Sequence, residues 1–262
     1  MGLLNYARAA VVTALFISVP IASSAQISVG IGVNIGPPPI PVYVQPPAPV
    51  ANYIWEPGYW AWGPGGYYWV PGTWVAPPTL GLYWTPGYWG WGSGAYYWHR
   101  GYWGPVVGFY GGINYGFGYY GTGYVGGRWY GNTFRYNVAV TNVNRTVIRN
   151  VYVDKTVIRE DNHVHISYNG GHGGITAQPT HDEIVARERG EAPTTEQRYH
   201  QELASQDRNH LSTVNGGHPN TTAVEHPYSA THQPAHVAPV TNADRAAAKQ
   251  HETASQGNKP PL

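Results

Sequence analysis

The fold is decided by four copies of the pattern Trp-x-x-Gly-x-Trp: Trp55-Glu-Pro-Gly-Tyr-Trp60, Trp69-Val-Pro-Gly-Thr-Trp74, Trp84-Thr-Pro-Gly-Tyr-Trp89 and Trp98-His-Arg-Gly-Tyr-Trp103. The four copies form a larger repeat, because the aromatic residues of the first two motifs recur 29 residues later in the last two. Repeats of this kind indicate one structural unit that is used more than once. The region 53–103 therefore contains two tandem copies of one aromatic unit.

Each unit predicts an antiparallel meander of short strands, because Pro-Gly pairs and glycine-rich stretches interrupt its aromatic runs. Across the loop at 63–66, Trp62 is expected to pair with Tyr67. Trp60 then lies opposite Trp69, and directly opposed residues share one face of a sheet. The expected fold class is mainly β, as a small sandwich or sheet, with two short exposed helices after it and much disorder.

The Pro-Gly pairs at 57–58 and 71–72 are expected to be further turn centres, which would place Trp55 opposite Trp60 and Trp69 opposite Trp74. Alternation along the strands then puts all five Trp of a unit on one side. These Trp are the candidate binding face. They are Trp55, Trp60, Trp62, Trp69, Trp74, Trp84, Trp89, Trp91, Trp98 and Trp103.

Two roles are open for these Trp. Two aromatic faces can close on each other as a core, which we favour because the region has few Leu, Ile or Phe residues with which to build one. Alternatively, one face stays open as a platform on which sugar rings or another envelope polymer stack. Solvent accessibility of the Trp residues distinguishes the two roles.

Charge is rare in the first half of the chain, where Arg8, Glu56 and Arg100 are the only charged residues before Arg128. With a net charge of +1 and no run of Lys or Arg, the sequence predicts no nucleic-acid or anionic-lipid partner. It contains no nucleophile elbow, phosphate loop or HExxH motif, and the aromatic region has a single carboxylate. We therefore expect no enzyme and no cofactor.

The first 25 residues predict a secretory signal peptide. A basic start at Arg8 precedes an apolar run from Ala9 to Ala22, and small residues precede the expected cleavage after Ala25. A membrane anchor is the weaker interpretation, because a spanning helix needs about 20 apolar residues and Pro20 interrupts this run. The chain is thus expected to be exported without an integral membrane span, and it has no cysteine for disulfides or a lipid anchor.

The rest of the chain divides by composition. Residues 104–131 are rich in Gly and Tyr, which disfavours a single packed conformation. In the small β segment, Val138–Val140 and Val151–Val153 alternate like strands, and Thr180 and Thr194 open capping-box patterns for two helices ending near Arg189 and His210. The remaining predicted segments are a Pro-rich tether at 26–52, the small β segment at 132–168, a polar helical segment at 169–212 and a disordered tail at 213–262.

Histidine gathers in the second half of the chain, and His163, His165 and His172 are weak candidates for metal ligands. A metal site needs three or four convergent ligands with orienting partners. No Cys or tight His/Asp/Glu cluster completes one here, so no metal site is predicted, and a solvated polar tail is the favoured interpretation.

The four motifs, together with the Tyr-x-Trp spacing at Tyr53, Tyr67 and Tyr96 and the following Gly/Tyr tract, resemble the bacterial YXWGXW (WXXGXW) repeat proteins. The resemblance covers roughly residues 50–210 and implies an exported, envelope-associated protein of a Gram-negative bacterium, located in the periplasm, at the outer membrane or outside the cell. The fourth copy departs from the pattern, because Arg100 replaces proline.

These observations lead to one expected function and two alternatives. The chain is expected to be a noncatalytic structural or interaction protein whose repeats contact an envelope protein or polymer. The first alternative is a carbohydrate- or peptidoglycan-binding module that uses Trp stacking, and the remote one is weak metal binding by histidine.

Overall fold

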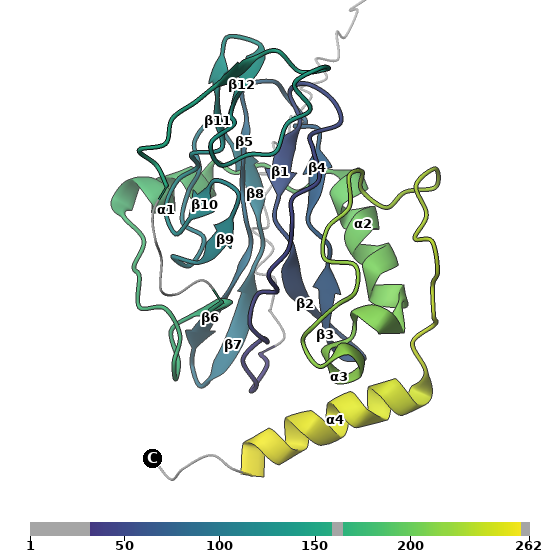
Figure 1. The fold of residues 1–262 in the computed structure, drawn as a ribbon. Helices are drawn as coiled ribbons and strands as arrows, with labels where there is room; N and C mark the ends of the chain where they lie inside the picture. Colours follow the sequence, from purple (N-terminus) through teal and green to yellow (C-terminus); the bar gives the residue numbers. More distant parts are fainter. Residues whose placement is uncertain (1–31, 159–164, 258–262) are drawn as a thin grey trace, which may run out of the picture.

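The computed structural model describes residues 32–158 and 165–257, so the predicted signal peptide lies outside the described residues. The fold is mainly β, with 28% of the described residues in strands and 18% in helices, which confirms the expected class. The strands form small sheets around an aromatic core, with helices on the outside (Figure 1).

The first repeat is one long hairpin. It contains β1 (Ile54–Glu56), β2 (Tyr59–Gly63), β3 (Gly66–Val70) and β4 (Thr73–Val75). Strands β2 and β3 pair as predicted, with Trp62 opposite Tyr67 and Trp60 opposite Trp69. The second repeat copies this arrangement with β5 (Tyr83–Thr85), β6 (Tyr88–Gly92), β7 (Ala95–His99) and β8 (Tyr102–Gly104).

The prediction that the Pro-Gly pairs are turn centres was wrong. Strand β1 pairs with β4, which places Trp55 opposite Trp74, and β5 pairs with β8 in the same way, placing Trp84 opposite Trp103. An L-Pro-Gly centre prefers a type II turn, whereas tight hairpins need types I′ or II′. The chain therefore continues through each Pro-Gly pair, and the two pairs of a repeat meet halfway along the hairpin.

The glycine of each motif is required where the two Pro-Gly pairs meet. A Cβ on Gly72 would lie 2.6 Å from Cζ2 of Trp55 and 2.9 Å from the backbone N of Gly58. The second repeat shows the same relation, because a Cβ on Gly101 would lie 2.5 Å from Cζ2 of Trp84. The first Trp of each motif thus covers the glycine of the partner motif. This contact explains why Trp and Gly recur at the same spacing in all four motifs of the chain.

Each hairpin is stabilised by two pairs of Trp rings within it. In the first repeat, Trp55 and Trp74 have ring centroids 5.2 Å apart, as do Trp60 and Trp69, in edge-to-face geometry. Aromatic pairs of this kind add about 0.5–1.5 kcal/mol each beyond the burial of their surface. The corresponding centroid distances in the second repeat are 5.3 Å for Trp84 with Trp103 and 5.5 Å for Trp89 with Trp98.

The two hairpins lie side by side and share one core (Figure 1). The indole N–H of Trp89 in the second repeat donates to the backbone oxygen of Trp60 in the first, at 2.7 Å. The ring of Trp89 also meets Tyr67 edge-on, with centroids 5.3 Å apart. The aromatic residues therefore join the repeats as well as each hairpin.

Residues 32–52 pack against the repeats, so the described part of the Pro-rich segment is not the tether that we expected. The indole N–H of Trp60 donates to the oxygen of Pro39 at 3.0 Å, and that of Trp74 donates to Pro46 at 2.9 Å. Extended proline-rich backbone makes no internal hydrogen bonds. Its free carbonyls can therefore accept from buried indoles.

The Gly/Tyr-rich segment is also packed, contrary to expectation. It forms β9 (Asn114–Gly116) and β10 (Tyr119–Tyr120). The side chains of Tyr110, Tyr115 and Tyr119 are buried, and the Tyr115 hydroxyl donates to the Gly87 oxygen at 2.6 Å. Each ring buries a large apolar area while its hydroxyl satisfies a backbone carbonyl, which offsets the entropy lost by the glycines.

The small β segment has a different topology from the prediction. Strands β11 (Gly127–Tyr130), β12 (Thr133–Asn137) and β13 (Val151–Tyr152) form one sheet, in which β13 runs parallel to β12. Residues 138–140, expected to be a strand, form a turn. Asn137 explains this turn, because its side-chain oxygen accepts from the backbone N–H of Ala139 and Asp154. Strand β14 (Tyr168–Asn169) joins β6.

Both predicted capping boxes are present. Helix α1 (His181–Glu188) is capped by Thr180 and α2 (Thr195–Gln206) by Thr194, each reciprocally with the residue at the third helical position. Helix α2 is not the exposed helix that we expected, because it packs against β3 and buries His200. His200 Nε2 lies 2.9 Å from the Pro71 oxygen, while its Nδ1 accepts from the backbone N–H of Tyr228. This pairing requires a neutral ring, and burial lowers the His200 pKa to about 4.

The described part of the 213–262 tail is ordered against the first repeat rather than disordered. Its backbone pairs with Gly72, the oxygen of Thr222 accepts from the Trp69 indole at 3.0 Å, and Asp244 forms an ion pair with Arg208 at 2.9 Å. The remaining elements are η1 (Arg208–His210), α3 (Ser212–Asn215) and α4 (Asn242–Gly257), the last lying across the bottom of the molecule (Figure 1).

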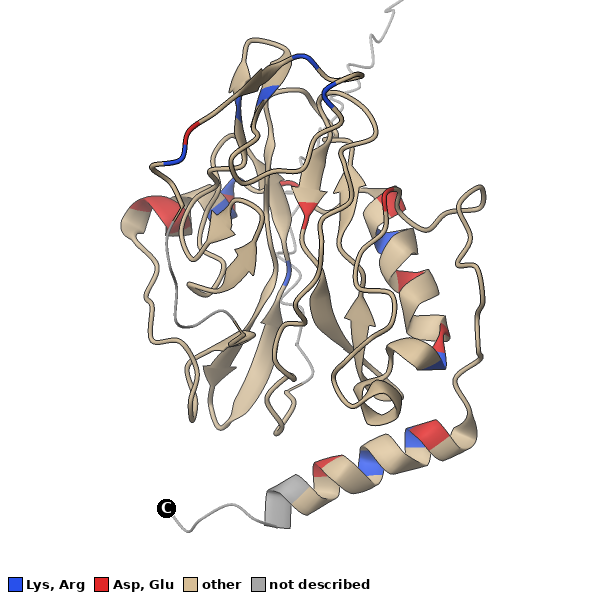
Figure 2. Cartoon of the chain, in the orientation of Figure 1, with Lys and Arg blue, Asp and Glu red and all other residues tan. Residues whose placement is uncertain are grey.

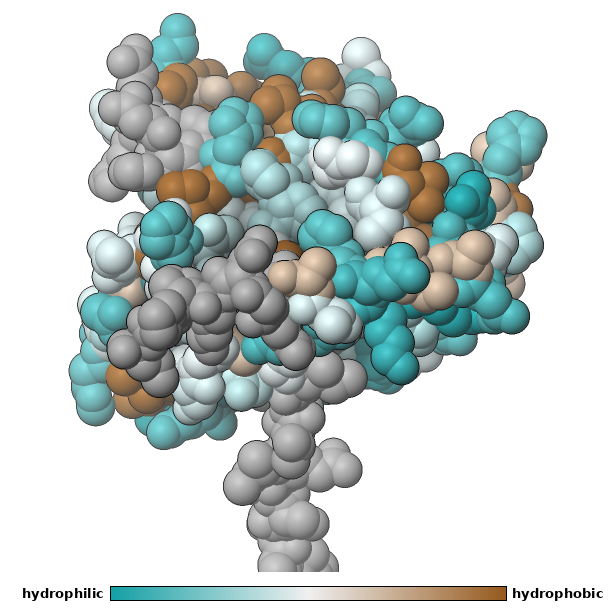
Figure 3. Space-filling model, turned by 90° about the horizontal axis from the view of Figure 1, so that it is seen from below, coloured by the Kyte–Doolittle hydropathy of each residue, from teal (hydrophilic) through white to brown (hydrophobic). Residues whose placement is uncertain are grey.

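Charged and apolar residues are distributed unevenly over the described chain. Charged side chains lie mostly on the helices and loops, and the repeat strands are almost free of them (Figure 2). On the face seen from below, hydrophobic residues form small separate patches among hydrophilic ones (Figure 3). No helix within 32–158 and 165–257 is both long and apolar enough to cross a membrane.

Candidate functional site

Most of the ten candidate Trp lie in the core, so they do not form an open ten-residue face. The two hairpins turn their indoles toward each other and toward the flanking segments, as in the closed-core alternative. Trp62 and Trp98 are half-buried, and Trp91 is 39% exposed. The seven buried residues are Trp55, Trp60, Trp69, Trp74, Trp84, Trp89 and Trp103.

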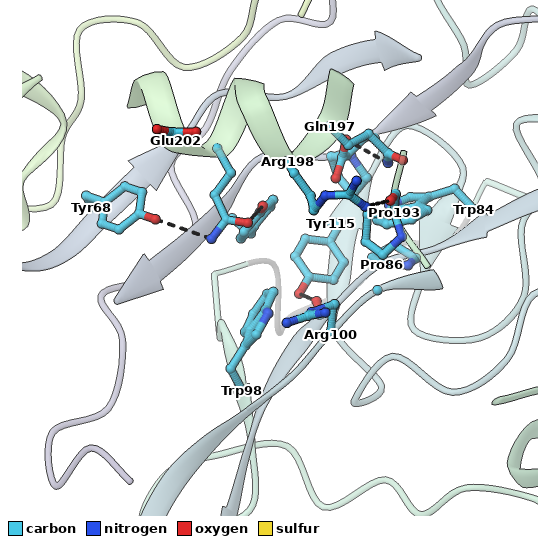
Figure 4. A pocket seen from close by; sticks show the side chains of 16 residues that line it. Tyr68, Trp84, Pro86, Trp98, Arg100, Tyr115, Pro193, Gln197, Arg198 and Glu202 are labelled. Carbon is cyan, nitrogen blue, oxygen red and sulfur yellow. Dashed lines mark hydrogen bonds between the residues drawn. The ribbon is translucent and has the colours of Figure 1, made fainter. Parts of the chain in front are cut away.

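A cleft of about 270 Å³ lies where the Pro-Gly crossings of both repeats meet helix α2; we call it the repeat cleft (Figure 4). Repeat 1 contributes the wall around Glu56, repeat 2 contributes the wall around Arg100, and the start of α2 closes the cleft. Its lining consists of Glu56, Pro57, Tyr59, Tyr68, Trp84, Pro86, Gly87, Trp98, Arg100, Gly101, Tyr115, Pro193, Gln197, Arg198, Gln201 and Glu202.

The repeat cleft collects both charged residues of the aromatic region. Glu56 and Arg100 are the only charged side chains between Arg8 and Arg128, they come from different repeats, and both line the cleft. Each also marks a difference between the copies. Repeat 2 has Thr85 at the position of Glu56, and repeat 1 has Pro71 at the position of Arg100.

Glu56 is held in place by the capping box of α2. Its side chain is 5% exposed, and Gln197 Nε2 donates to Glu56 Oε2 at 3.0 Å. The other end of the Gln197 amide accepts from the Trp103 indole at 2.7 Å and from the Thr194 backbone N–H at 2.9 Å. Burial raises the pKa of Glu56 to about 8, although the Gln197 hydrogen bond opposes the shift, so this carboxyl is mostly protonated at pH 7.

Two guanidinium groups lie at the opening of the repeat cleft. Arg198 donates to the Pro193 oxygen and to Thr195 Oγ1, which orients it at the start of α2. Arg100 is exposed and makes no side-chain hydrogen bond or ion pair with the described residues. Figure 4 shows its guanidinium beside Trp98 and Tyr115. The guanidinium is thus available to a ligand.

Aromatic rings and amides form the rest of the wall. Tyr59 and Trp98, one from each repeat, stack with centroids 5.1 Å apart and an interplanar angle of 17°. Gln201 joins the tyrosines of repeat 1, because it accepts from the Tyr59 hydroxyl at 3.2 Å and donates to the Tyr68 hydroxyl at 3.3 Å. Burial raises the pKa of Tyr59 well above 10, so this phenol stays neutral. Flat apolar rings beside fixed polar groups are typical of sites that bind small molecules.

The histidine candidates are not brought together. His163 lies outside the described residues, His165 places Nδ1 3.2 Å from the Ile40 oxygen, and His172 is exposed in a loop. Within 32–158 and 165–257, no three His, Asp or Glu side chains are arranged to hold a metal ion.

The sequence contained a partial signal for the repeat cleft. Two lone charges in an otherwise uncharged aromatic region, one of them replacing a motif proline, mark Glu56 and Arg100. Nothing local indicated Gln197, Arg198 or Glu202, which reach the cleft from about 100 or more residues further along the chain. Glu202 also brings a second carboxyl to the site from outside the aromatic region.

The fold and the repeat cleft define a class of protein: tandem aromatic hairpins that share a core and leave one cleft between them. The model of the WXXGXW repeat matches the chain in two copies, at residues 51–75 and 83–103. No curated protein and no solved structure gives a significant match.

Proposed function

We propose that the chain is a noncatalytic, exported, envelope-associated interaction protein that binds its partner in the repeat cleft. The repeats supply a rigid aromatic scaffold, and the polar groups of the site come from two positions at which the copies differ and from helix α2. One observation carries the proposal: the only two charged residues of the aromatic region, Glu56 and Arg100, line the same cleft although they belong to different repeats.

Binding is a better use of this cleft than catalysis. Glu56 is largely buried and engaged by Gln197, and Arg198 is engaged by the backbone and Thr195. A rigid set of partners keeps groups oriented for recognition, which reduces the entropy lost when a ligand binds. Release of nitrophenol from a panel of nitrophenyl glycosides, dependent on Glu56 and Glu202, would contradict the noncatalytic part of the proposal.

A carbohydrate is the second candidate for the partner, and the wall of the repeat cleft favours it. Trp98 is half-buried and stacks on Tyr59, and the amide of Gln201 and the carboxyl of Glu202 line the same cleft. Sugars present apolar C–H faces for stacking and hydroxyls for hydrogen bonds, which matches an aromatic wall with polar neighbours. The volume of about 270 Å³ is slightly below the usual range for drug-sized ligands, so it suits one ring.

Intrinsic Trp fluorescence tests the site. The purified chain is titrated with soluble peptidoglycan fragments and a panel of neutral and acidic glycans, and a saturable change is expected. Glu202→Phe fills the cleft and should abolish the change. Glu196→Phe, at an exposed position of α2 outside the cleft lining, is the matched control and should retain it. Equal titrations of both variants would place the binding elsewhere.

Export is tested separately by cell fractionation. A C-terminally tagged chain, expressed in a Gram-negative host, should be recovered from the periplasm or the outer-membrane fraction after removal of about 25 residues. Mass spectrometry of the mature N-terminus locates the cleavage. An uncleaved chain recovered from the cytoplasm would refute the envelope location without bearing on the cleft.

A further inference from the structure

The third position of the motif turns toward the repeat cleft in three of its four copies. Pro57, Pro86 and Arg100 all line the cleft, whereas the oxygen of Pro71 is bound by His200. Three prolines and one arginine at equivalent positions show that the hairpin geometry does not need a cation there. The guanidinium of Arg100 is therefore unexplained by the fold.

No hydrogen bond or ion pair with the described residues explains Arg100 either. No described carboxylate lies within ion-pair distance of it, and the one ion pair among the described residues joins Arg208 to Asp244. A guanidinium is planar and donates two parallel hydrogen bonds, so it recognises a carboxylate bidentately. Its unfilled donors point to a ligand that carries such a group.

The charges around the cleft favour an anion over a neutral ligand. Arg100 of repeat 2 and Arg198 of α2 line it, and Glu202, four residues after Arg198 on α2, lies away from Arg100. Because burial raises the pKa of Glu56 to about 8, that carboxyl adds little negative charge at pH 7. The lining thus carries two cations and one carboxylate besides Glu56, and a ligand carboxylate near the arginines is not repelled by Glu56.

We propose that the repeat cleft binds an acidic sugar, with the carboxylate on the Arg100 guanidinium and the sugar ring packed against the stacked pair of Tyr59 and Trp98. This inference rests on the proposed binding function of the cleft and narrows it to one class of ligand. Trp98 lies near the end of β7 and Arg100 directly follows this strand, so one short segment of repeat 2 brings both the indole and the cation to the cleft.

The test uses two matched pairs of probes on the whole mature chain. N-acetylmuramate differs from N-acetylglucosamine by a carboxylate-bearing ether, and glucuronate differs from glucose by oxidation of one carbon to a carboxylate. Dissociation constants are measured by ligand-detected NMR at low ionic strength. We expect the acidic member of at least one pair to have a dissociation constant at least about tenfold lower than that of its neutral partner. A charge-assisted bidentate hydrogen bond contributes binding free energy of that order.

Variants at Arg100 assign the selectivity. Arg100→Gln should bring the acidic sugar to the affinity of the neutral one, and Arg100→Lys should retain only part of the preference because it cannot form the bidentate pair. Arg145→Gln is the matched control, since Arg145 is exposed and lies outside the cleft lining. It should leave both affinities unchanged. Thermal unfolding confirms that each variant is folded.

The outcomes separate this inference from the proposed function. Equal affinities within both pairs, or a preference that survives in Arg100→Gln, would overturn the acidic-sugar assignment while the cleft remains a binding site for neutral glycans. Absence of binding by all four sugars at millimolar concentration would also overturn it. The Glu202→Phe titration with other envelope components would then decide whether the cleft binds anything.

Discussion

The two repeats have the same backbone plan but different roles at the repeat cleft. Both form a bent hairpin in which the first Trp of each motif covers the glycine of the other motif, as Trp55 covers Gly72 and Trp84 covers Gly101. Repeat 1 alone contributes an ionisable acid and repeat 2 alone contributes a cation. The two copies therefore share one scaffold, and differences at single positions give the cleft its carboxyl group and its guanidinium group.

Their surroundings differ as well. Repeat 1 is covered by α2 and by the segment that leads to α4, whereas repeat 2 gains β14 along β6 (Figure 1). Trp62 of repeat 1 is half-buried, while its counterpart Trp91 in repeat 2 is 39% exposed. Equivalent residues thus have unequal packing, and substitutions can measure the difference.

The largest expected effect comes from removing the first Trp of each repeat. Trp55→Ala and Trp84→Ala should each reduce the free energy of unfolding by about 3–5 kcal/mol, because both indoles are buried against a partner Trp and a glycine. Trp91→Ala is the exposed control and should cost about 1 kcal/mol or less. Urea unfolding measures all three. Equal losses at the three positions would show that the indoles do not share a protected core.

The second largest expected effect is a change of stability with pH. It distinguishes Glu56 of repeat 1 from Thr85, the residue at the matching position of repeat 2. The pKa of Glu56 is raised from 4.5 to about 8 in the folded chain. The folded state therefore holds a proton that the unfolded state releases, and stability from this group is lost as pH rises from about 4.5 to about 8. Glu56→Gln should remove this loss and unfold with a free energy higher by on the order of 3 kcal/mol at pH 8.

The difference in unfolding free energy between wild type and Glu56→Gln, measured at intervals from pH 5 to pH 8.5, isolates this group from the titrating histidines. Thr85→Val at the matched position of repeat 2 removes no ionisable group and should keep the wild-type slope. A difference that does not vary with pH would mean that Glu56 is ionised throughout.

A smaller effect tests whether the two Pro-Gly crossings are equivalent. Gly72→Ala and Gly101→Ala each force a Cβ against an indole and a backbone nitrogen, and each should cost about 2 kcal/mol. Gly92→Ala is the control, because no heavy atom lies within 4 Å of its added Cβ. Chemical denaturation compares the three. If only one crossing were sensitive, the two hairpins would differ in their path through the Pro-Gly pair.

The smallest expected effect on stability is that of Arg100→Pro, which restores the residue found in the other three motifs. The free energy of unfolding should change by no more than about 0.5 kcal/mol, since an exposed side chain with no described partner is removed. The acidic-sugar preference should disappear in the same variant. A large destabilisation would show that Arg100 supports the hairpin and would weaken its assignment to a ligand.

Much of the local structure was predictable from the sequence. The glycine-rich loop at 63–66 placed Trp62 opposite Tyr67, because a short loop between two aromatic runs sets the register of its own hairpin. The capping boxes at Thr180 and Thr194 located the starts of α1 and α2, because a side-chain cap satisfies backbone donors within the first helical turn. Both signals involve residues only a few positions apart.

Only the tertiary structure decided which surfaces meet. The pairing of Trp55 with Trp74, the packing of the Pro-rich segment and the bond from Gln197 to Glu56 join residues separated by 19 to 141 positions. Such contacts depend on which buried donors find free acceptors and which rings fill the remaining space, and neither is encoded by local periodicity. The sequence alone determined the register of the hairpin at 63–66 and the caps of two helices. Burial determined that most of the Trp residues form a core and that two lone charges line one cleft.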